Sequence, residues 1–202
     1  MKLYFAPNTR AVRIAWLLEE LGLPYEIERY TLGDPAMRSA EFRAIHPMGR
    51  VPVLEDGDVR LFESGAIVQY LLARHGGGAL QPAPDSANFP AYLQWLHYAE
   101  GMLMPPVNTI VVETILLPED RRSEPHVKRA TKLLGQMLQS IEAHLSDGRD
   151  YLANDFSGAD IMLGHAVAAA RTFGADFDEL PHLAAYLDRL SDRPAWQKAH
   201  GL

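Results

Sequence analysis

The order of the secondary-structure patterns is the feature that most restricts how this chain can fold. Over residues 1–75, strand-like runs alternate with segments of helical spacing, and a hairpin signal, Asp56-Gly57, separates two of the strands. Beyond residue 88, the apolar residues recur at helical spacing only. These patterns predict an N-terminal α/β domain of order β-α-β-α-β-β-α and an all-α C-terminal helical bundle.

Glycine and proline positions set the limits of these parts. Gly22 and Pro24 end the first helix, because glycine accepts the left-handed conformation after a helix and proline cannot continue one. The Gly- and Pro-rich run before residue 89 is typical of an interdomain linker. We expect an α/β domain at 1–77, a linker at 78–88 and a helical domain at 89–202. The strands are expected at 2–5, 25–30, 53–55 and 59–62, and the first helices at 11–21, at 35–45 and from Ser64.

The second half is expected to contain helices throughout. Residues 107–117 are β-branched and favour a strand by propensity, but their helical neighbours favour a helix. Ser157 and Asp160 have the spacing of a capping box, with Asp in place of Glu, and predict a helix start worth about 1 kcal/mol. The other helices are expected at 91–104, which leads into Pro105-Pro106, from the first-turn Pro125, at 180–191 and at 194–202.

Composition excludes several classes of function. The net charge of −7 argues against general binding to nucleic acid or to an anionic membrane. No run approaches the roughly 20 apolar residues of a membrane span, and no leader pattern begins the chain, so a cytoplasmic protein is expected. There is no cysteine, and no histidine pair has metal-ligand spacing. We therefore expect no metal site, and any sulfur chemistry must use a thiol supplied by a ligand.

The turn between the first strand and the first helix is the first candidate for chemistry. The β-α-β-α-β-β-α layout is that of the thioredoxin-like fold, whose redox members have a Cys-x-x-Cys pair in this turn. Here the turn is Pro7-Asn8-Thr9-Arg10, which excludes disulfide exchange by the protein. It provides an amide, a hydroxyl and a guanidinium at a helix N-terminus, where negative charge is favoured.

Four segments resemble the glutathione S-transferase family in sequence and order. They are LYFAPNTRAVRIAWLLEELGLPYE at 3–26, HPMGRVPVLEDG at 46–57, LFESGAIVQYL at 61–71 and FSGADI at 156–161. The resemblance covers nearly the whole chain. It implies a cytosolic homodimer of bacterial type that takes glutathione as co-substrate, although the first turn matches no subclass of the family cleanly.

The resemblance implies a binding role for two short motifs. It implies a cis Val51-Pro52 bond that lets the backbone of Val51 pair with the cysteinyl unit of glutathione. It also implies that Glu63 meets the γ-glutamyl ammonium and that Ser64 meets the γ-glutamyl carboxylate. The simpler alternatives are a trans proline that begins an edge strand, a Ser64 that only caps a helix and a solvated Glu63. Arg50 either faces the glycyl carboxylate or is solvated.

The residue that activates the thiol is expected in the first turn. Members of the family lower the thiol pKa by donating a hydrogen bond to the thiolate. Thr9 is our first candidate, followed by Asn8 and Arg10. Arg10 lies where the bacterial beta class has its cysteine, so this chain departs from that class. Tyr4 lies inside the apolar strand and is expected in the core.

The second substrate is expected between the two halves, against the helix that contains Trp95 and Met102. A flexible, apolar methionine suits a permissive pocket for electrophiles. Glu100 is a candidate for reaching the site of a partner subunit. The residues expected to line this pocket are Tyr98, Gly101, Met102 and Pro105. Simple helix packing is the favoured alternative for most of these side chains taken one by one.

The resemblance thus implies a detoxifying transferase that conjugates glutathione to hydrophobic electrophiles. Glutathione-dependent peroxidase, isomerase or dehalogenase activity would use the same bound thiol and remains an alternative. A non-catalytic module that binds glutathione or another ligand is the alternative from a different class.

Overall fold

The computed structural model describes all residues from Met1 to Leu202, and they form two compact units. The first unit contains Met1–Gln81 together with Ser191–Leu202, and the second contains Pro82–Leu190. The last residues, 191–202, therefore group with the α/β unit, whereas the sequence led us to expect them in the helical domain.

The first unit is built on a mixed sheet of four strands. Its order is β2-β1-β3-β4, with β1 parallel to β2 and antiparallel to β3. The hairpin of β3 and β4 turns through Gly57, whose φ of 58° is a left-handed conformation that glycine adopts without strain. The strands are β1 (Lys2–Phe5), β2 (Glu26–Arg29), β3 (Val53–Asp56) and β4 (Val59–Phe62).

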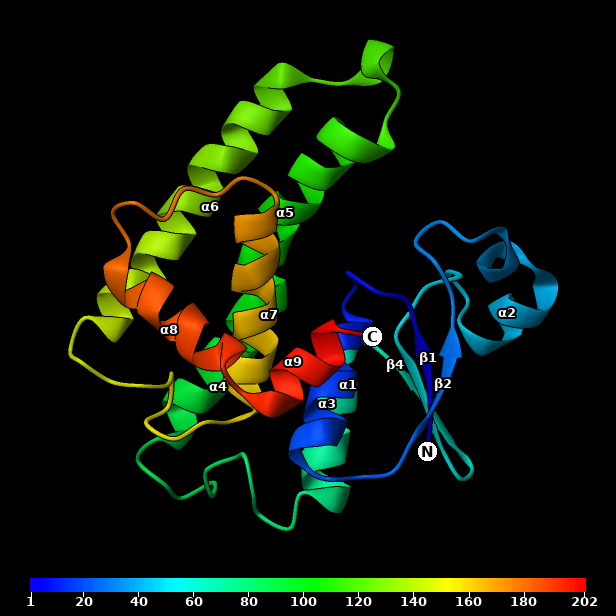
Figure 1. Cartoon of the computed structure of the whole chain (residues 1–202), viewed down its shortest axis with the longest axis horizontal. Helices are drawn as coiled ribbons and strands as arrows, with labels where there is room; N and C mark the ends of the chain where they lie inside the picture. Colours follow the sequence, from blue (N-terminus) through cyan, green and yellow to red (C-terminus); the bar gives the residue numbers. More distant parts are fainter. The chain divides into compact units, whose positions relative to one another are not determined.

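Helices cover both faces of this sheet. Helices α1 (Ala11–Glu20) and α3 (Ser64–His75) pack together on one face, and α2 (Ala40–Ile45) lies on the other, after the 3₁₀ turn η1 (Pro35–Arg38) (Figure 1). On the α2 side, Tyr4 is buried in a cluster with Met37, Phe42 and Val53. The expected β-α-β-α-β-β-α order and the assignment of Tyr4 to the core are confirmed.

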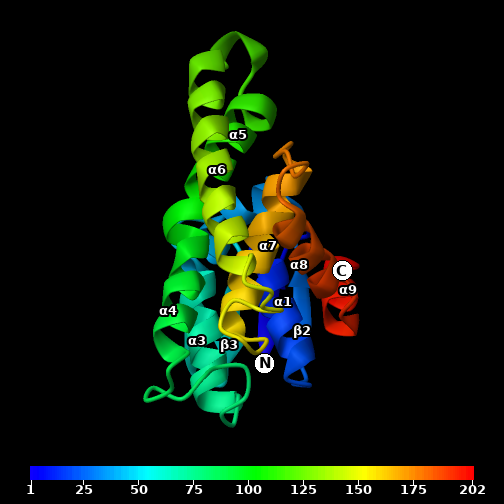
Figure 2. The ribbon, with the colours of Figure 1, turned by 90° about the vertical axis from the view of Figure 1, so that its left-hand side faces the viewer.

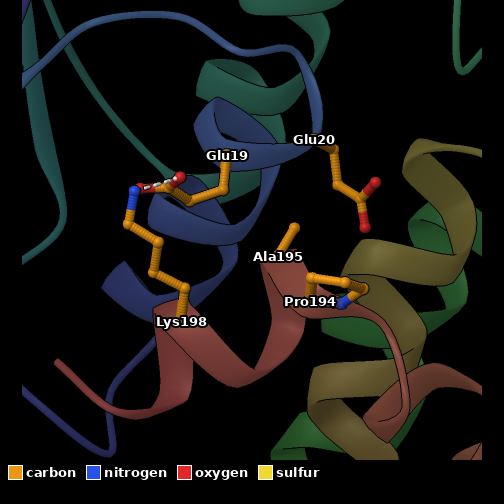
Figure 3. Close-up of a pocket in the computed structure, with 5 residues that line it drawn as sticks. All are labelled: Glu19, Glu20, Pro194, Ala195 and Lys198. Carbon is orange, nitrogen blue, oxygen red and sulfur yellow. Dashed lines mark hydrogen bonds and ion pairs between the residues drawn. The ribbon is translucent and has the colours of Figure 1, made fainter.

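Helix α9 (Pro194–His200) belongs to this unit because it packs along α1. Trp196 meets Trp16 edge to face, with ring centroids 4.6 Å apart. Two ion pairs flank this aromatic contact, Arg193 with Glu20 at 2.7 Å and Lys198 with Glu19 at 2.7 Å. Figure 3 shows Lys198 directed from α9 at Glu19, across a shallow pocket that is also lined by Glu20, Pro194 and Ala195.

The second unit is entirely helical, as the sequence predicts. One long segment combines α4 (Phe89–Tyr98), the π-helical η2 (Ala99–Leu103), α5 (Met104–Val111) and the π-helical η3 (Val112–Leu116). The helix thus continues through Pro105-Pro106, because these prolines directly follow the π-helical η2, where the wider i→i+5 pattern accommodates their rings and missing N–H groups. The preference for helix over strand at 107–117 is confirmed.

The remaining helices pack against that segment. Helix α6 (Glu124–Leu145) runs beside α5, as Figure 2 shows, and α7 (Gly158–Thr172) packs on α4. Helix α8 (Pro181–Ser191) ends the unit at Leu190. No helix in the chain is both long enough and apolar enough to cross a membrane.

The capping box at the start of α7 is confirmed and extends further than expected. Asp160 is fully buried and accepts hydrogen bonds from the N–H and hydroxyl of Ser157, at 2.8 and 2.9 Å. It also accepts from the N–H of Leu152 and the hydroxyl of Tyr186, both at 3.0 Å. Burial raises the pKa of Asp160 to about 6, although these four donors favour the charged form. One carboxylate therefore joins α7, α8 and the loop before α7.

Candidate functional site

The turn before β3 presents the backbone of Val51. The Val51-Pro52 peptide bond is cis, as the resemblance implies. Pro52 is buried, and Val53 beyond it pairs with Tyr4 in the sheet. No hydrogen bond within the chain engages the N–H or C=O of Val51. The turn thus offers one backbone donor and one backbone acceptor to a ligand.

The loop from His46 to Arg50 holds this turn in place. Nδ1 of the buried His46 ring accepts a hydrogen bond from the Met48 N–H, at 3.1 Å. The backbone carbonyl of His46 accepts a second one from the Gly49 N–H, at 2.8 Å. Gly49 has a φ of 61°, and a Cβ there would lie 2.2 Å from the carbonyl oxygen of Met37, so no larger residue fits. The His46 ring also packs on Phe62, with centroids 4.7 Å apart.

His46 therefore links the Val51 turn to the end of β4. Burial lowers the pKa of His46, the nearby Glu63 carboxylate acts to raise it, and the Arg50 guanidinium acts to lower it. The ring is thus neutral at pH 7, and its Nδ1 can accept the Met48 N–H. The charges of Arg50 and Glu63 thus both act on one buried histidine.

We predict that replacement of His46 by Leu weakens glutathione binding about tenfold, because a lost buried acceptor costs roughly 1–3 kcal/mol. His46→Asn is the matched control, because an Asn side chain can accept a hydrogen bond from the backbone N–H two residues later, here that of Met48. Because the folded pKa is lowered, the contribution of His46 is complete above pH 6.5 and declines as the pH falls. Calorimetric titration between pH 7 and 5 should show affinity falling in the wild type and not in His46→Asn. Equal affinities for the Leu and Asn variants would contradict this role.

The Glu63-Ser64 junction lies between β4 and α3. Glu63 is exposed, has a φ of 74° and occupies the N-cap position of α3 without a side-chain capping bond. Ser64 is buried as the first residue of the helix, and its Oγ accepts a hydrogen bond from Nη1 of Arg13, at 3.0 Å. The reading of Ser64 as a simple N-cap is therefore wrong. An exposed carboxylate and a buried hydroxyl stand side by side at a helix N-terminus.

The turn before α1 contains the three candidates for thiol activation. The Thr9 hydroxyl donates to the Ala6 carbonyl at 2.6 Å and accepts the Ala11 N–H at 3.2 Å, so its proton is directed into the chain. Asn8 is exposed with a φ of 57°, and no hydrogen bond within the chain engages its side-chain amide. Arg10 is half-buried at the N-cap position of α1 and makes no capping bond with its side chain. The Thr9 hydroxyl is thus engaged by the backbone of its own turn, whereas the Asn8 amide is exposed.

The residues expected to line an electrophile pocket belong to the second unit and differ in their surroundings. Tyr98, at the end of α4, is half-buried and donates its hydroxyl to the carbonyl of Met137 at 3.2 Å. Gly101, Met102 and Pro105 are exposed along η2 and α5, and Met102 is 45% exposed. The Tyr98 hydroxyl therefore contributes to helix packing, whereas the other three present a small, partly apolar surface.

Sequence reasoning did not identify Arg13 or His46 as parts of this site. Arg13 lies at a position of α1 that the helical pattern alone does not distinguish. His46 begins the HPMGRVPVLEDG segment, but the motif itself gives it no role. Nowhere in the chain do three His, Asp or Glu side chains gather in a way that could hold a metal ion.

Comparisons with known proteins match both parts of the chain to one family. Residues 1–73 match the family model of the glutathione S-transferase N-terminal domain, and residues 124–189 match a model of the C-terminal domain. The chain is 36% identical to glutathione S-transferase 4 of Zea mays over 192 residues, which cover 90% of this chain and 82% of that protein.

Solved structures of similar proteins extend the agreement to the fold. A Pseudomonas putida glutathione transferase with glutathione disulfide bound has a TM-score of 0.88 at 26% identity, covering 100% of this chain and 90% of that one. A sphingomonad glutathione S-transferase complexed with glutathione has a TM-score of 0.84 at 26% identity. That match covers 100% of this chain and 98% of the sphingomonad chain. With both family models matched and this level of identity along almost the whole sequence, the chain belongs to the glutathione S-transferase family of enzymes.

Proposed function

We propose that this chain binds glutathione in its first unit, lowers the pKa of the glutathione thiol and conjugates it to hydrophobic electrophiles. The observation that carries the proposal is a cis Val51-Pro52 turn whose Val51 backbone makes no hydrogen bond within the chain, together with the adjacent Glu63 carboxylate and Ser64 hydroxyl at the start of α3. The related structures that contain glutathione or its disulfide support the same ligand for this chain.

Each part of glutathione has a complementary group in this set. The N–H and C=O of Val51 pair with the cysteinyl unit as an added strand would. Glu63 accepts from the γ-glutamyl ammonium, while the Ser64 hydroxyl and the N-terminus of α3 receive the γ-glutamyl carboxylate. Arg50 is exposed beside the turn and is our candidate for the glycyl carboxylate. The three charged ends of the ligand thus meet groups of opposite charge or donors.

Asn8 is our candidate for the group that stabilises the thiolate. Its amide N–H faces solvent at the N-terminal side of α1, where the helix dipole also favours negative charge. Arg10 adds a positive charge two residues away. A donor and a nearby cation that lower the thiol pKa by about two units stabilise the thiolate by roughly 2.7 kcal/mol. The thiolate then attacks the electrophilic carbon directly, and no covalent enzyme intermediate forms.

We predict that Asn8→Ala lowers kcat/KM for conjugation of an aryl halide about 10- to 100-fold, with little change in glutathione affinity. Thr9→Val is the matched comparison, because it removes the hydroxyl that caps the turn. We expect it to destabilise the first unit by about 1 kcal/mol and to leave the thiol pKa unchanged. A large loss of kcat in Thr9→Val combined with full activity in Asn8→Ala would overturn the assignment of Asn8.

The remaining parts of the proposal concern the electrophile and the assembly. We place the electrophile against Tyr98, Gly101, Met102 and Pro105, and we expect a cytoplasmic homodimer in which Glu100 is a candidate for contact with the partner's ligand. Peroxidase, isomerase or dehalogenase activity would use the same thiolate, so parallel assays with a hydroperoxide and an alkyl halide distinguish these reactions. Binding of glutathione without turnover of any of these substrates would favour a non-catalytic module.

A further inference from the structure

Arg13 is an unusual residue to find inside α1. Its side chain is fully buried, and its Nη1 donates a hydrogen bond to the Oγ of Ser64 at 3.0 Å, across 51 positions of sequence. Its helical neighbours Val12, Ile14 and Ala15 are core residues. Burial of a guanidinium is costly, so an apolar residue at this position would serve the packing of α1 better. The structure therefore suggests a role for Arg13 beyond packing.

The hydrogen bond fixes how the Ser64 hydroxyl can be used. A serine hydroxyl has one proton to donate and two lone pairs that accept. Arginine can only donate, so Arg13 occupies a lone pair of Oγ and cannot take the hydroxyl proton. A carbonyl or carboxylate at the same place would accept that proton and direct it into the protein. With Arg13 there, the proton remains available for an acceptor at the start of α3.

We propose that Arg13 is a positioning residue that makes Ser64 a dedicated donor to the α-carboxylate of the γ-glutamyl group. The proposal rests on the proposed function and names how one ligand group is recognised. The Arg13 hydrogen bond also polarises the hydroxyl, which strengthens the bond that Ser64 then donates to an anion. Specificity for glutathione over analogues that lack this carboxylate thus depends on a residue that does not touch the ligand.

The test compares two ligands and three variants by calorimetric titration. The ligands are glutathione and 4-aminobutyryl-cysteinylglycine, which keeps the ammonium and lacks the α-carboxylate. We expect Arg13→Met and Ser64→Ala each to raise the Kd for glutathione about 10- to 100-fold and to leave the Kd for the analogue within about twofold. The double variant should lose no more than Ser64→Ala alone, because Arg13 acts through Ser64.

Two further variants separate positioning from general destabilisation. Arg13→Lys keeps a buried cation and a donor and should restore part of the glutathione affinity. Arg74→Met removes an exposed arginine from the far end of α3 and should change neither Kd. If Arg13→Met unfolds the first unit, the Lys variant and Ser64→Ala still measure the preference for the carboxylate.

The outcomes distinguish this inference from the proposed function. Equal losses for glutathione and the analogue in Arg13→Met or Arg13→Lys, or additive losses in the double variant, would show that Arg13 only supports the fold. If the wild type fails to bind glutathione, the proposed function itself is wrong. If the wild type binds both ligands and the Arg13 variants lose affinity for glutathione but not for the analogue, the role of Arg13 is established.

Discussion

Replacement of Asp160 by Ala is expected to destabilise the helical unit by about 3–5 kcal/mol. The substitution removes the acceptor of four hydrogen-bond donors. These are the Leu152 N–H, the N–H and hydroxyl of Ser157 and the Tyr186 hydroxyl. Each buried donor that loses its acceptor costs roughly 1–3 kcal/mol, and the losses overlap because the donors can relax together. Hydrogen exchange should show the largest loss of protection at the start of α7 and in the loop at Leu152.

The matched control is Asp150→Ala. Asp150 forms a partly exposed ion pair with Arg189 at 2.9 Å, and such pairs contribute about 1 kcal/mol at most. Asp160→Asn should be almost as destabilising as the Ala variant, because its amide nitrogen cannot accept from two of the four donors. If urea denaturation gave Asp160→Ala and Asp150→Ala the same midpoint, the buried carboxylate would not have the structural role described here.

Replacement of Trp196 by Ala is expected to destabilise the first unit by about 3–5 kcal/mol. Trp196 is 7% exposed, packs edge to face on Trp16 and stacks on His200 with centroids 3.9 Å apart. The substitution leaves a cavity between α9 and α1, although the ion pairs of Arg193 and Lys198 persist. Since α1 also begins at the turn that contains Asn8, weaker glutathione binding should accompany the loss.

Two controls place this effect in the first unit. Trp196→Phe keeps an aromatic ring against Trp16 and should lose less than half as much stability. Gln197→Ala changes an exposed neighbour on α9 and should have an effect within about 0.5 kcal/mol. A Trp196→Ala variant whose increased hydrogen exchange is confined to the helical unit would contradict the assignment of residues 191–202 to the first unit.

Most of the element order could be predicted because the signals are local. Alternation, helical spacing, Gly57 and the Ser157–Asp160 pair act over a few residues, and the structure confirms each of them. The path through Pro105-Pro106 could not be predicted, because a π-helical segment accommodates the prolines and leaves no mark in the sequence. The placement of α9 depends on the contact of Trp196 with Trp16, which are 180 positions apart.

In the candidate site too, local features could be predicted from the sequence and features that depend on the folded structure could not. Val51-Pro52 and Glu63-Ser64 could be proposed because the resemblance rests on short motifs, and the structure confirms the cis bond. The orientation of the Thr9 proton toward Ala6 could not be predicted, since a hydroxyl near a helix start can serve either the backbone or a ligand. The hydrogen bond from Arg13 to Ser64 joins two helices that only the folded sheet brings together.

The most direct test of the central claim is a spectrophotometric titration of the thiolate of bound glutathione. Free cysteine thiols have a pKa of about 8.5. We predict that the pKa of glutathione bound to the wild type lies about one to two units lower, and that Asn8→Ala returns it most of the way to the free value. A bound thiol that titrates near 8.5 in the wild type would contradict the account.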